Sequence, residues 1–142
     1  MNKMKNIITT LLFSTLLFAG FNSNAQCDTV AQVCNELIDG EFISDGQQYR
    51  SLLINDETAE FFMTFYGGTT YRIAACSGLT EGNLIFRIFD AERNLLFDNS
   101  TYNNAGYWDF TFTETQECTI EAQLDNSASG SGCAVVLIGF SE

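Results

Sequence analysis

The sequence contains no histidine, and it has only six Lys and Arg residues against 18 Asp and Glu. Hydrolytic triads need a base that titrates near neutral pH, which is usually histidine. Zinc sites use histidine or closely spaced cysteines, and the five cysteines include no C-x-x-C pair. Paired carboxylates can cleave glycosides without histidine, but a small domain with a filled core offers little pocket volume. We therefore expect no catalytic activity.

Long hydrophobic runs are also missing, except near the start of the chain. Two lysines precede an apolar run of 13 residues, Ile7–Ala19, and Ser23 and Ala25 place small residues at −3 and −1 of a cleavage site. The run is shorter than the roughly 20 residues of a membrane-spanning helix. We predict a secretory signal peptide at 1–25, cleaved after Ala25, and export to the periplasm or the exterior without membrane insertion.

Positive charge is scarce in the predicted mature chain, residues 26–142. Both lysines leave with the signal peptide, so four arginines face 18 acidic residues and the net charge is −14. A polyanion repels phosphate backbones and anionic lipid, so nucleic acid is not an expected partner. The charge is explained either by the solubility of an exported protein or by cation binding. The remaining 117 residues match the size of one domain.

All five cysteines lie in the predicted mature chain, which suggests two disulfides and one unpaired thiol in an oxidising compartment. Cys76 ends one predicted strand and Cys133 begins the last, so we predict a disulfide between these two residues. The second pair is then either Cys27 with Cys34 or Cys34 with Cys118. The unpaired thiol is either buried and inert or couples two chains.

Apolar residues follow a helical spacing only in residues 27–39, which predicts one short helix that ends at Gly40. From residue 47 onward the pattern alternates with period 2 between polar turns. About eight short strands without a second helix predict a single all-β domain, an antiparallel β-sandwich or jelly roll with a short N-terminal helix. The expected strands are 47–54, 60–66, 70–76, 83–90, 95–98, 107–113, 117–124 and 133–140.

The stretch 60–76 reads as a hairpin whose two strands are joined at Gly67 and Gly68. Its alternating Phe and Tyr residues suggest either an aromatic binding surface or a pair of strands that forms part of the core. Set against the rest of the chain, the second interpretation is favoured. The last strand, Cys133–Phe140, is almost continuously apolar, which is typical of a central strand covered on both faces.

The loop before the aromatic strand 107–113 combines tyrosines with asparagines. Flat rings can stack on the apolar face of a sugar, and amides can bind its hydroxyls. Trp108 shares a strand face with Phe110 and Phe112, so we expect this tryptophan in the core instead. The predicted carbohydrate-binding residues are Tyr102, Asn103, Asn104 and Tyr107.

Acidic and amide side chains near the ends of two predicted strands suggest calcium. Ca²⁺ prefers six to eight oxygen ligands from carboxylates, amides and carbonyls. Asp and Asn are also ordinary turn residues, which is the alternative explanation. The predicted calcium ligands are Asp90, Asp98 and Asn99.

Three stretches together resemble the bacterial pre-peptidase C-terminal domain family: residues 65–76, 84–99 and 133–140. Gly68-Thr69-Thr70-Tyr71 matches the G-T-x-Y turn of the family, and Asp90 with Leu95-Leu96 matches its D-x-x-G-x-L-L element. Asn94 stands where the family often has glycine. The resemblance covers roughly residues 45–140.

This resemblance implies a small jelly-roll-like sandwich, usually an accessory domain of a secreted protease, and some relatives bind calcium or adhere to insoluble substrates. We expect this domain to stand alone behind its signal peptide, without a preceding protease. The sequence thus predicts an exported, non-catalytic binding or accessory module of the bacterial envelope, with a carbohydrate or an envelope protein as partner. The alternatives are a calcium-binding accessory domain for secreted hydrolases and a carbohydrate-binding module.

Overall fold

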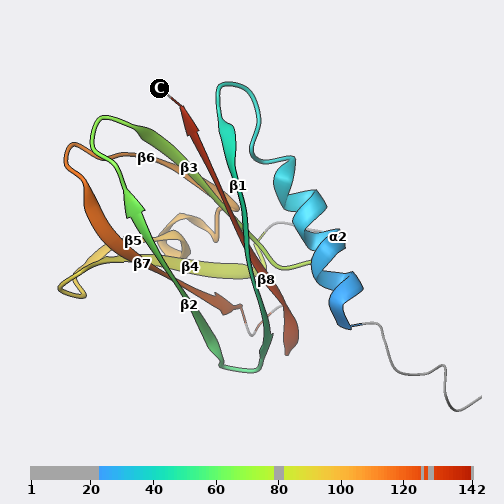
Figure 1. Cartoon of the computed structure of the whole chain (residues 1–142). Helices are drawn as coiled ribbons and strands as arrows, with labels where there is room; N and C mark the ends of the chain where they lie inside the picture. Colours follow the sequence, from blue (N-terminus) through green and yellow to red (C-terminus); the bar gives the residue numbers. More distant parts are fainter. Residues whose placement is uncertain (1–22, 79–81, 126, 128–129, 142) are drawn as a thin grey trace, which may run out of the picture.

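A computed structural model describes residues 23–78, 82–125, 127 and 130–141 (Figure 1). One α-helix precedes eight strands, and a short 3₁₀-helix follows the fifth strand. The elements are α2 (Ser23–Asn35), β1 (Ile43–Ile54), β2 (Thr58–Phe65), β3 (Thr70–Cys76), β4 (Leu84–Asp90), β5 (Leu95–Asp98), η2 (Asn99–Tyr102), β6 (Tyr107–Thr111), β7 (Gln116–Leu124) and β8 (Ser131–Ser141).

The strands form two four-stranded antiparallel sheets packed face to face. Sheet A has the order β1-β8-β3-β6, and sheet B has the order β2-β7-β4-β5. Consecutive strands lie in opposite sheets except for the β4–β5 hairpin, which is the connectivity of an eight-stranded jelly roll. The predicted fold class, an antiparallel sandwich with a short N-terminal helix, is confirmed.

The helix is shorter at its C-terminal end than its sequence pattern predicts. It ends at Asn35, four residues before the expected last residue Asp39. The next residues continue in tighter turns, in which the Leu37 N–H donates to the Cys34 carbonyl at 3.1 Å. The predicted signal peptide lies outside the described residues except for Ser23–Ala25, which belong to α2, so the cleavage site stays a prediction. Within the described part of the chain, no helix is both long and apolar enough to span a bilayer.

The predicted hairpin at residues 60–76 is wrong, because its two arms belong to different sheets. β2 pairs with β7, whereas β3 pairs with β6 and β8. The two glycines instead let the chain cross from sheet B to sheet A. Gly68 has φ +83°, and a Cβ on Gly67 would lie 2.8 Å from the Thr113 carbonyl oxygen. The crossing therefore needs a left-handed residue and a residue without a side chain.

The main core fills the space between the two sheets. Its largest fully buried side chains come from both layers and include Phe65, Phe86, Ile73, Ile120 and Ile138. The Phe65 ring stacks on that of Phe112, with centroids 4.5 Å apart. Alternate residues of the amphipathic strands supply this core, as their period-2 pattern predicts.

A second, smaller core lies between α2 and the outer face of sheet A. Val30, Ala31 and Cys34 of the helix pack against Val135 and Leu137 of β8. The other face of β8 contributes Ala134, Val136 and Ile138 to the main core. This arrangement confirms the prediction of a central strand covered on both faces, and it explains why Cys133–Phe140 lacks polar alternation.

Two disulfides attach the helix to sheet A, and the predicted Cys76–Cys133 pair is wrong. Cys27 is bonded to Cys133, and Cys34 is bonded to Cys76. Seven helical residues rise about 10 Å, which is too far for a Cys27–Cys34 bridge and places both cysteines on one helix face. Because α2 lies over β8 and β3, each strand cysteine finds its partner in the helix above it. The alternative Cys34–Cys118 pair is also wrong.

The free cysteine, Cys118, is buried in the main core with 3% of its surface exposed. Burial, with a smaller contribution from the negative charge of Asp90, raises the pKa of the Cys118 thiol to about 11. The thiol therefore stays protonated at neutral pH, and the thiolate is the reactive form. Of the two predicted fates, the structure supports the buried, inert thiol.

We expect no labelling of Cys118 by a maleimide in native, non-reduced protein at pH 7. Intact-mass analysis should show one adduct when the same reagent is added in denaturant, because unfolding exposes this thiol while both disulfides persist. A Cys118→Ala variant, which should take up no label in denaturant, is the control. Rapid labelling of the native protein would contradict the burial of Cys118.

Candidate functional site: a groove between two edge strands

The tyrosines of the predicted carbohydrate site point in different directions. Tyr102, which is 51% exposed, stacks on Phe97 at 5.6 Å and lies 4.3 Å from Trp108 between ring centroids. Tyr107 precedes Trp108 on β6, so its side chain points to the opposite face of sheet A. There it lies 4.4 Å from the Arg72 guanidinium. The two tyrosines therefore do not form one platform.

The two asparagines of that predicted site shape the loop after η2. Asn103 and Asn104 have φ values of +56° and +52°, a conformation that asparagine tolerates well. The Asn104 side chain donates to the Gly82 carbonyl at 3.1 Å and to the Asp125 carboxylate at 2.8 Å. These contacts hold three loops together, and carbohydrate binding at this place stays a prediction.

The three predicted calcium ligands each make contacts with the protein. The Asn94 side chain donates to Asp90 at 2.8 Å, and this bond, together with those from the backbone N–H groups of Asn94 and Glu92, holds the pKa of Asp90 below its usual value. Asp98 pairs with Arg87 at 2.8 Å and caps η2. The Asn99 side chain is fully buried and bonds to backbone groups. The described residues contain no cluster of three or more His, Cys, Asp or Glu side chains suited to a metal, and calcium binding stays a prediction.

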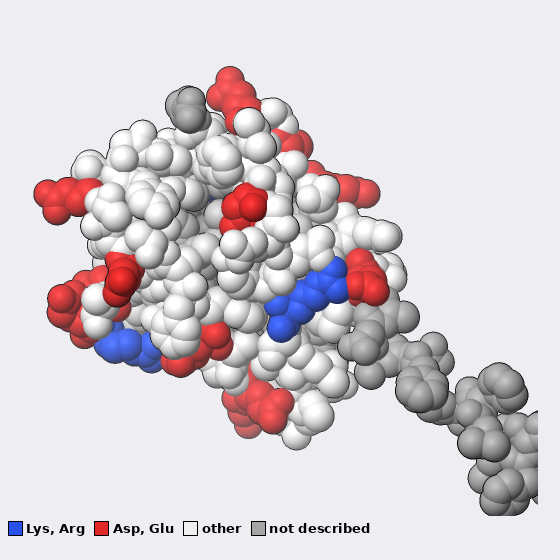
Figure 2. All heavy atoms as spheres, viewed as in Figure 1, with Lys and Arg blue, Asp and Glu red and all other residues white. Residues whose placement is uncertain are grey.

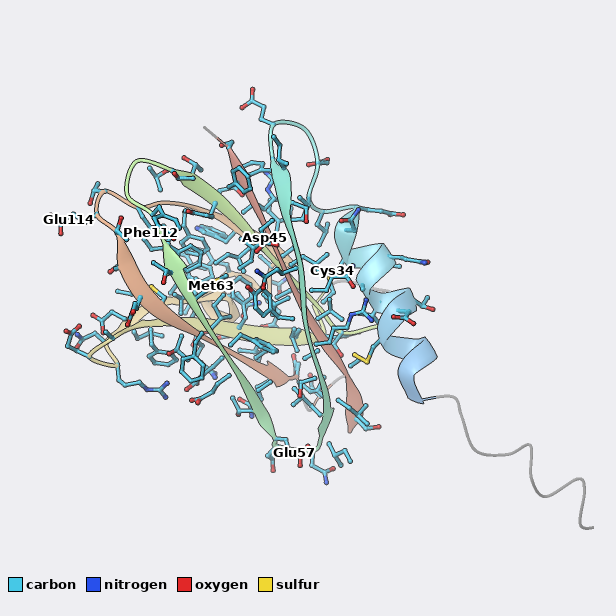
Figure 3. All side chains as sticks on the ribbon, viewed as in Figure 1. Cys34, Asp45, Glu57, Met63, Phe112 and Glu114 are labelled. Atoms are coloured by element: carbon cyan, nitrogen blue, oxygen red, sulfur yellow. A yellow bond between two sulfur atoms is a disulfide. The ribbon has the colours of Figure 1, made fainter. Side chains whose placement is uncertain are left out.

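A hollow lined by residues from four strands lies at one edge of the sandwich. We call it the edge groove. It has a volume of about 680 Å³ and lies between β1, the edge strand of sheet A, and β2, the edge strand of sheet B. Figure 3 shows Asp45 and Met63 in the opening between these two strands. Its volume falls within the range of about 300–1,000 Å³ that is typical of ligand sites.

The edge groove has an apolar floor and an aromatic rim. Phe65 and Ile138 form part of the floor and are fully or almost fully buried. Phe62 and Tyr66 lie at the rim with 72% and 62% of their surface exposed. The Tyr66 N–H donates to the Tyr71 hydroxyl at 3.1 Å, which fixes the turn that carries the rim. Exposed rings beside a concave surface are typical of binding sites rather than of solvated edges.

A bulge in β1 places a carboxylate in this groove. β1 advances from Ser44 to Gln48 while its partner β8 advances by only two residues, so two extra residues are accommodated in β1. Gly46 allows the bend with φ +79°, and its N–H donates to the Ser44 hydroxyl at 3.1 Å. The Asp45 carboxylate accepts from the Gln47 N–H at 2.8 Å. Bulges commonly redirect a side chain next to a functional site.

The surroundings of Asp45 disfavour its charge. Partial burial raises the pKa of Asp45, and the bond from Gln47 only partly offsets this effect. Burial and the nearby Asp45 charge also raise the pKa of Tyr49, whose hydroxyl donates to the Gln47 side chain at 3.1 Å. Figure 2 shows a largely uncharged surface on the face that carries β1 and β2, with acidic residues mainly around its margin, one acidic group within it and two basic groups toward its lower part.

No arginine neutralises Asp45. The six ion pairs of the described residues use all four arginines of the predicted mature chain, and none of them involves Asp45. Asp45 is therefore a partly desolvated carboxylate without a cationic partner in the described part of the chain.

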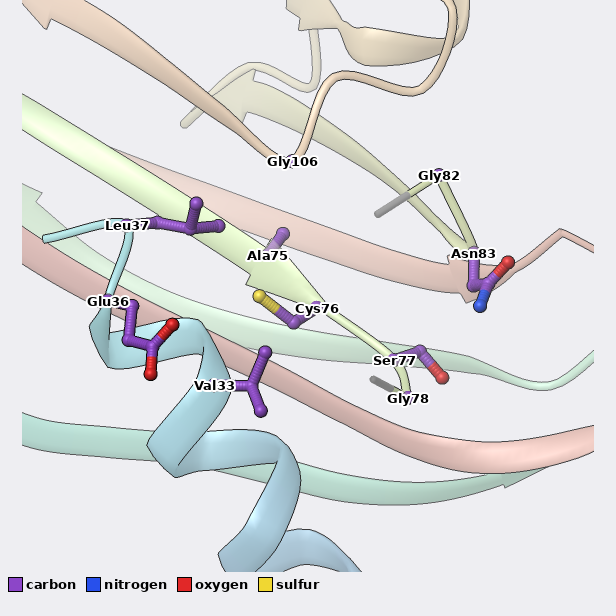
Figure 4. Close-up of a pocket in the computed structure, with 10 residues that line it drawn as sticks. All are labelled: Val33, Glu36, Leu37, Ala75, Cys76, Ser77, Gly78, Gly82, Asn83 and Gly106. Atoms are coloured by element: carbon purple, nitrogen blue, oxygen red, sulfur yellow. The ribbon is translucent and has the colours of Figure 1, made fainter. Parts of the chain in front are cut away.

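A smaller hollow lies beside the Cys34–Cys76 disulfide (Figure 4). It is lined by the end of α2, the end of β3 and the segment near Gly106, with Leu37, Ala75 and Ser77 among its residues. Its volume of about 170 Å³ is below that of typical small-molecule sites. The edge groove is therefore the better candidate.

The sequence pattern contains a signal for the edge groove. β2 carries aromatic residues on both of its faces, Phe61 and Phe65 toward the core and Phe62 away from it. The expectation that residues 60–76 serve only the core therefore holds for one face of β2. The groove is also formed by β1 and β8, whose positions next to β2 and β3 follow from a topology that strand patterns do not reveal.

No protein-family model matches the chain, and no curated protein matches it, so the resemblance to pre-peptidase C-terminal domains stays a prediction. Among solved structures, the chain is similar to PliG of Aeromonas hydrophila, described as a periplasmic lysozyme inhibitor of g-type lysozyme. The TM-score is 0.52 with 11% identity, over 67% of this chain and 85% of PliG. This likeness establishes a shared fold.

Proposed function

We propose that the chain is an exported, non-catalytic module that binds another protein through the edge groove. The observation that carries this proposal is the pair of exposed rings, Phe62 and Tyr66, at the rim of a groove of about 680 Å³. Aromatic residues are enriched at the centres of protein interfaces because they bury a large area at low entropic cost.

Three further features support binding rather than catalysis. The chain has no histidine, and the carboxylate in the groove stands alone rather than in a pair. Two disulfides span the helix and sheet A, which suits a rigid binding surface in an oxidising compartment. A protein of the same fold, PliG, is described as an enzyme inhibitor.

A protein partner is favoured over a carbohydrate. The predicted sugar platform is divided between two faces of sheet A, as Tyr102 and Tyr107 show. The edge groove instead lies beside two edge strands, each paired on one side only among the described residues. Unpaired strand edges with exposed apolar side chains are surfaces that other protein chains recognise.

The double variant Phe62→Ser/Tyr66→Ser tests this proposal. The mature protein is immobilised, and the proteins that it retains from the envelope extract and medium of the exporting cells are quantified by mass spectrometry. We expect the variant to retain its principal partner at least about tenfold less than the wild type, because two rim residues each contribute on the order of 1–2 kcal/mol.

The matched control is Leu95→Ser/Leu96→Ser, which removes two exposed apolar side chains on β5, at the opposite edge of sheet B. This control should retain the partner like the wild type. Equal retention by all three proteins, or equal loss in both variants, would count against the edge groove. Melting curves of both variants verify that they are folded.

A further inference from the structure

Asp45 is held in place by the protein but forms no ion pair with any of the described residues. Its carboxylate accepts one backbone N–H, and the bulge that positions it is supported by Gly46 and Ser44. The nearby contact of the Tyr49 hydroxyl with the Gln47 side chain is between neutral groups. Arg50, further along β1, pairs with Asp28 instead of Asp45. The geometry thus fixes a carboxylate in an apolar groove at a cost in desolvation, which is a pattern typical of functional sites.

The side chains around this carboxylate favour a cation with a flat or apolar body. Tyr49, Phe62 and Tyr66 line the same groove as Asp45. Cations bind to the faces of aromatic rings, and the guanidinium group does so most often because it is planar and weakly hydrated. A carboxylate beside such rings adds a charge-assisted hydrogen bond.

The chain itself contains an example of this chemistry outside the edge groove. The Arg72 guanidinium lies 4.3 Å from the centroid of the Phe42 ring and 4.4 Å from that of Tyr107. Its nitrogens pair with Asp39 and Asp109 at 2.8 Å. Two rings, two carboxylates and the Leu37 carbonyl, which accepts at 3.2 Å, hold this guanidinium on the sandwich with only 13% of the Arg72 side chain exposed.

We propose that the edge groove binds an arginine side chain of the partner protein, with Asp45 accepting from its guanidinium and the aromatic rim packing on its body. This inference rests on the proposed function and specifies the chemistry of the partner. The net charge of −14 in the predicted mature chain supports it, since an acidic protein attracts a basic partner at long range. A metal ion fits less well, because Ca²⁺ needs six to eight oxygen ligands and the groove offers one carboxylate.

A short peptide tests this inference without knowledge of the partner. The probe is acetyl-Gly-Arg-Gly-amide, titrated into ¹⁵N-labelled mature protein at low salt while amide shifts are followed by NMR. We expect saturable shifts of Gly46, Gln47 and Tyr66 with a Kd in the millimolar range, which is reasonable for a single side chain. The citrulline analogue, which has the same shape without the charge, should bind at least about tenfold more weakly.

Asp45→Asn is the decisive variant. It keeps an oxygen that can accept from the Gln47 N–H but removes the charge, so binding of the arginine peptide should fall at least about tenfold. Its Tm should be unchanged or higher: the raised pKa of Asp45 means that folding disfavours the ionised form, so removing the charge relieves this cost at neutral pH. Glu92→Gln, an exposed charge on the β4–β5 turn, should leave binding unchanged.

The outcomes separate this inference from the proposed function. Equal binding of arginine and citrulline peptides, or equal effects of Asp45→Asn and Glu92→Gln, would overturn the arginine site. If the rim variant loses its protein partner while Asp45→Asn retains it in full, the groove binds a protein by other chemistry. If Asp45→Asn lowers the Tm, the carboxylate is structural and the arginine site is wrong.

Discussion

Replacing Asn99 by alanine should lower the free energy of unfolding by roughly 3 kcal/mol or more, because each of the buried groups left without a partner costs about 1–3 kcal/mol. The fully buried Asn99 amide accepts from the Phe86 N–H at 2.8 Å and donates to the Leu84 and Ala105 carbonyls at 3.0 and 3.1 Å. Strand β5 ends at Asp98, so this side chain takes over as the partner of β4 where the backbone pairing stops. Chemical denaturation of the variant measures the loss.

Two further variants test whether the loss of stability comes from the hydrogen bonds of the Asn99 side chain. Ser100→Ala, at an exposed neighbouring position, should change stability by less than about 0.5 kcal/mol. Asn99→Asp should be at least as destabilising as alanine at pH 7, since a carboxylate would face two carbonyls. It should recover in part at low pH, because protonation removes the charge and restores one donor. A loss of stability that appears only when calcium is present would instead support the predicted calcium site.

Removing either disulfide should lower the free energy of unfolding by as much as the Asn99→Ala substitution or more. In the chain-entropy model, a loop of 106 residues closed by Cys27–Cys133 contributes about 4.7 kcal/mol, and one of 42 residues closed by Cys34–Cys76 contributes about 4 kcal/mol. We expect the Cys34→Ala/Cys76→Ala variant to show a corresponding fall in stability. Because the smaller loop lies within the larger one, the two losses should not add fully.

The control for this experiment is Cys118→Ala, which removes the free thiol. Reductant should destabilise this variant as much as it destabilises the wild type, because both disulfides are intact in each. Peptide mapping under non-reducing conditions checks the connectivity directly. Detection of a Cys76–Cys133 peptide as the main species would contradict the arrangement described above.

The fold was predictable because it depends on local patterns. Each local pattern predicts one element and the faces that it buries. Polar and apolar residues alternate on β7 and β4, β8 is apolar on both faces, and residues near Val30 follow a helical spacing. The pairing of elements was less predictable. Gly67 and Gly68 are compatible with a hairpin, and the pairing of β2 with β7 and of β3 with β6 and β8 shows that the chain crosses between sheets instead.

The disulfides and the candidate site depend on this pairing, which explains why their prediction failed or was incomplete. Cys76 ends β3 as predicted, and Cys133 lies two residues inside the neighbouring strand β8 rather than at its start. The position of α2 above both cysteines decides their partners. Likewise, Asn99 is a plausible calcium ligand by residue type, and its burial against β4 becomes visible only in three dimensions. Asp45 depends on a bulge, which has no distinctive sequence signal apart from Gly46.

The larger disulfide also determines how the protein responds to mechanical load. Cys27 lies two residues after the predicted cleavage site, and its partner Cys133 lies within the last strand. Tension applied to the chain before Cys27 and after Cys133 would therefore pass through the sulfur–sulfur bond and bypass the 105 residues between them. Only the part of β8 beyond Cys133 can peel away from its neighbours. The edge groove would lose Ile138 and Phe140 in that event, while the rest of the sandwich stayed a closed loop.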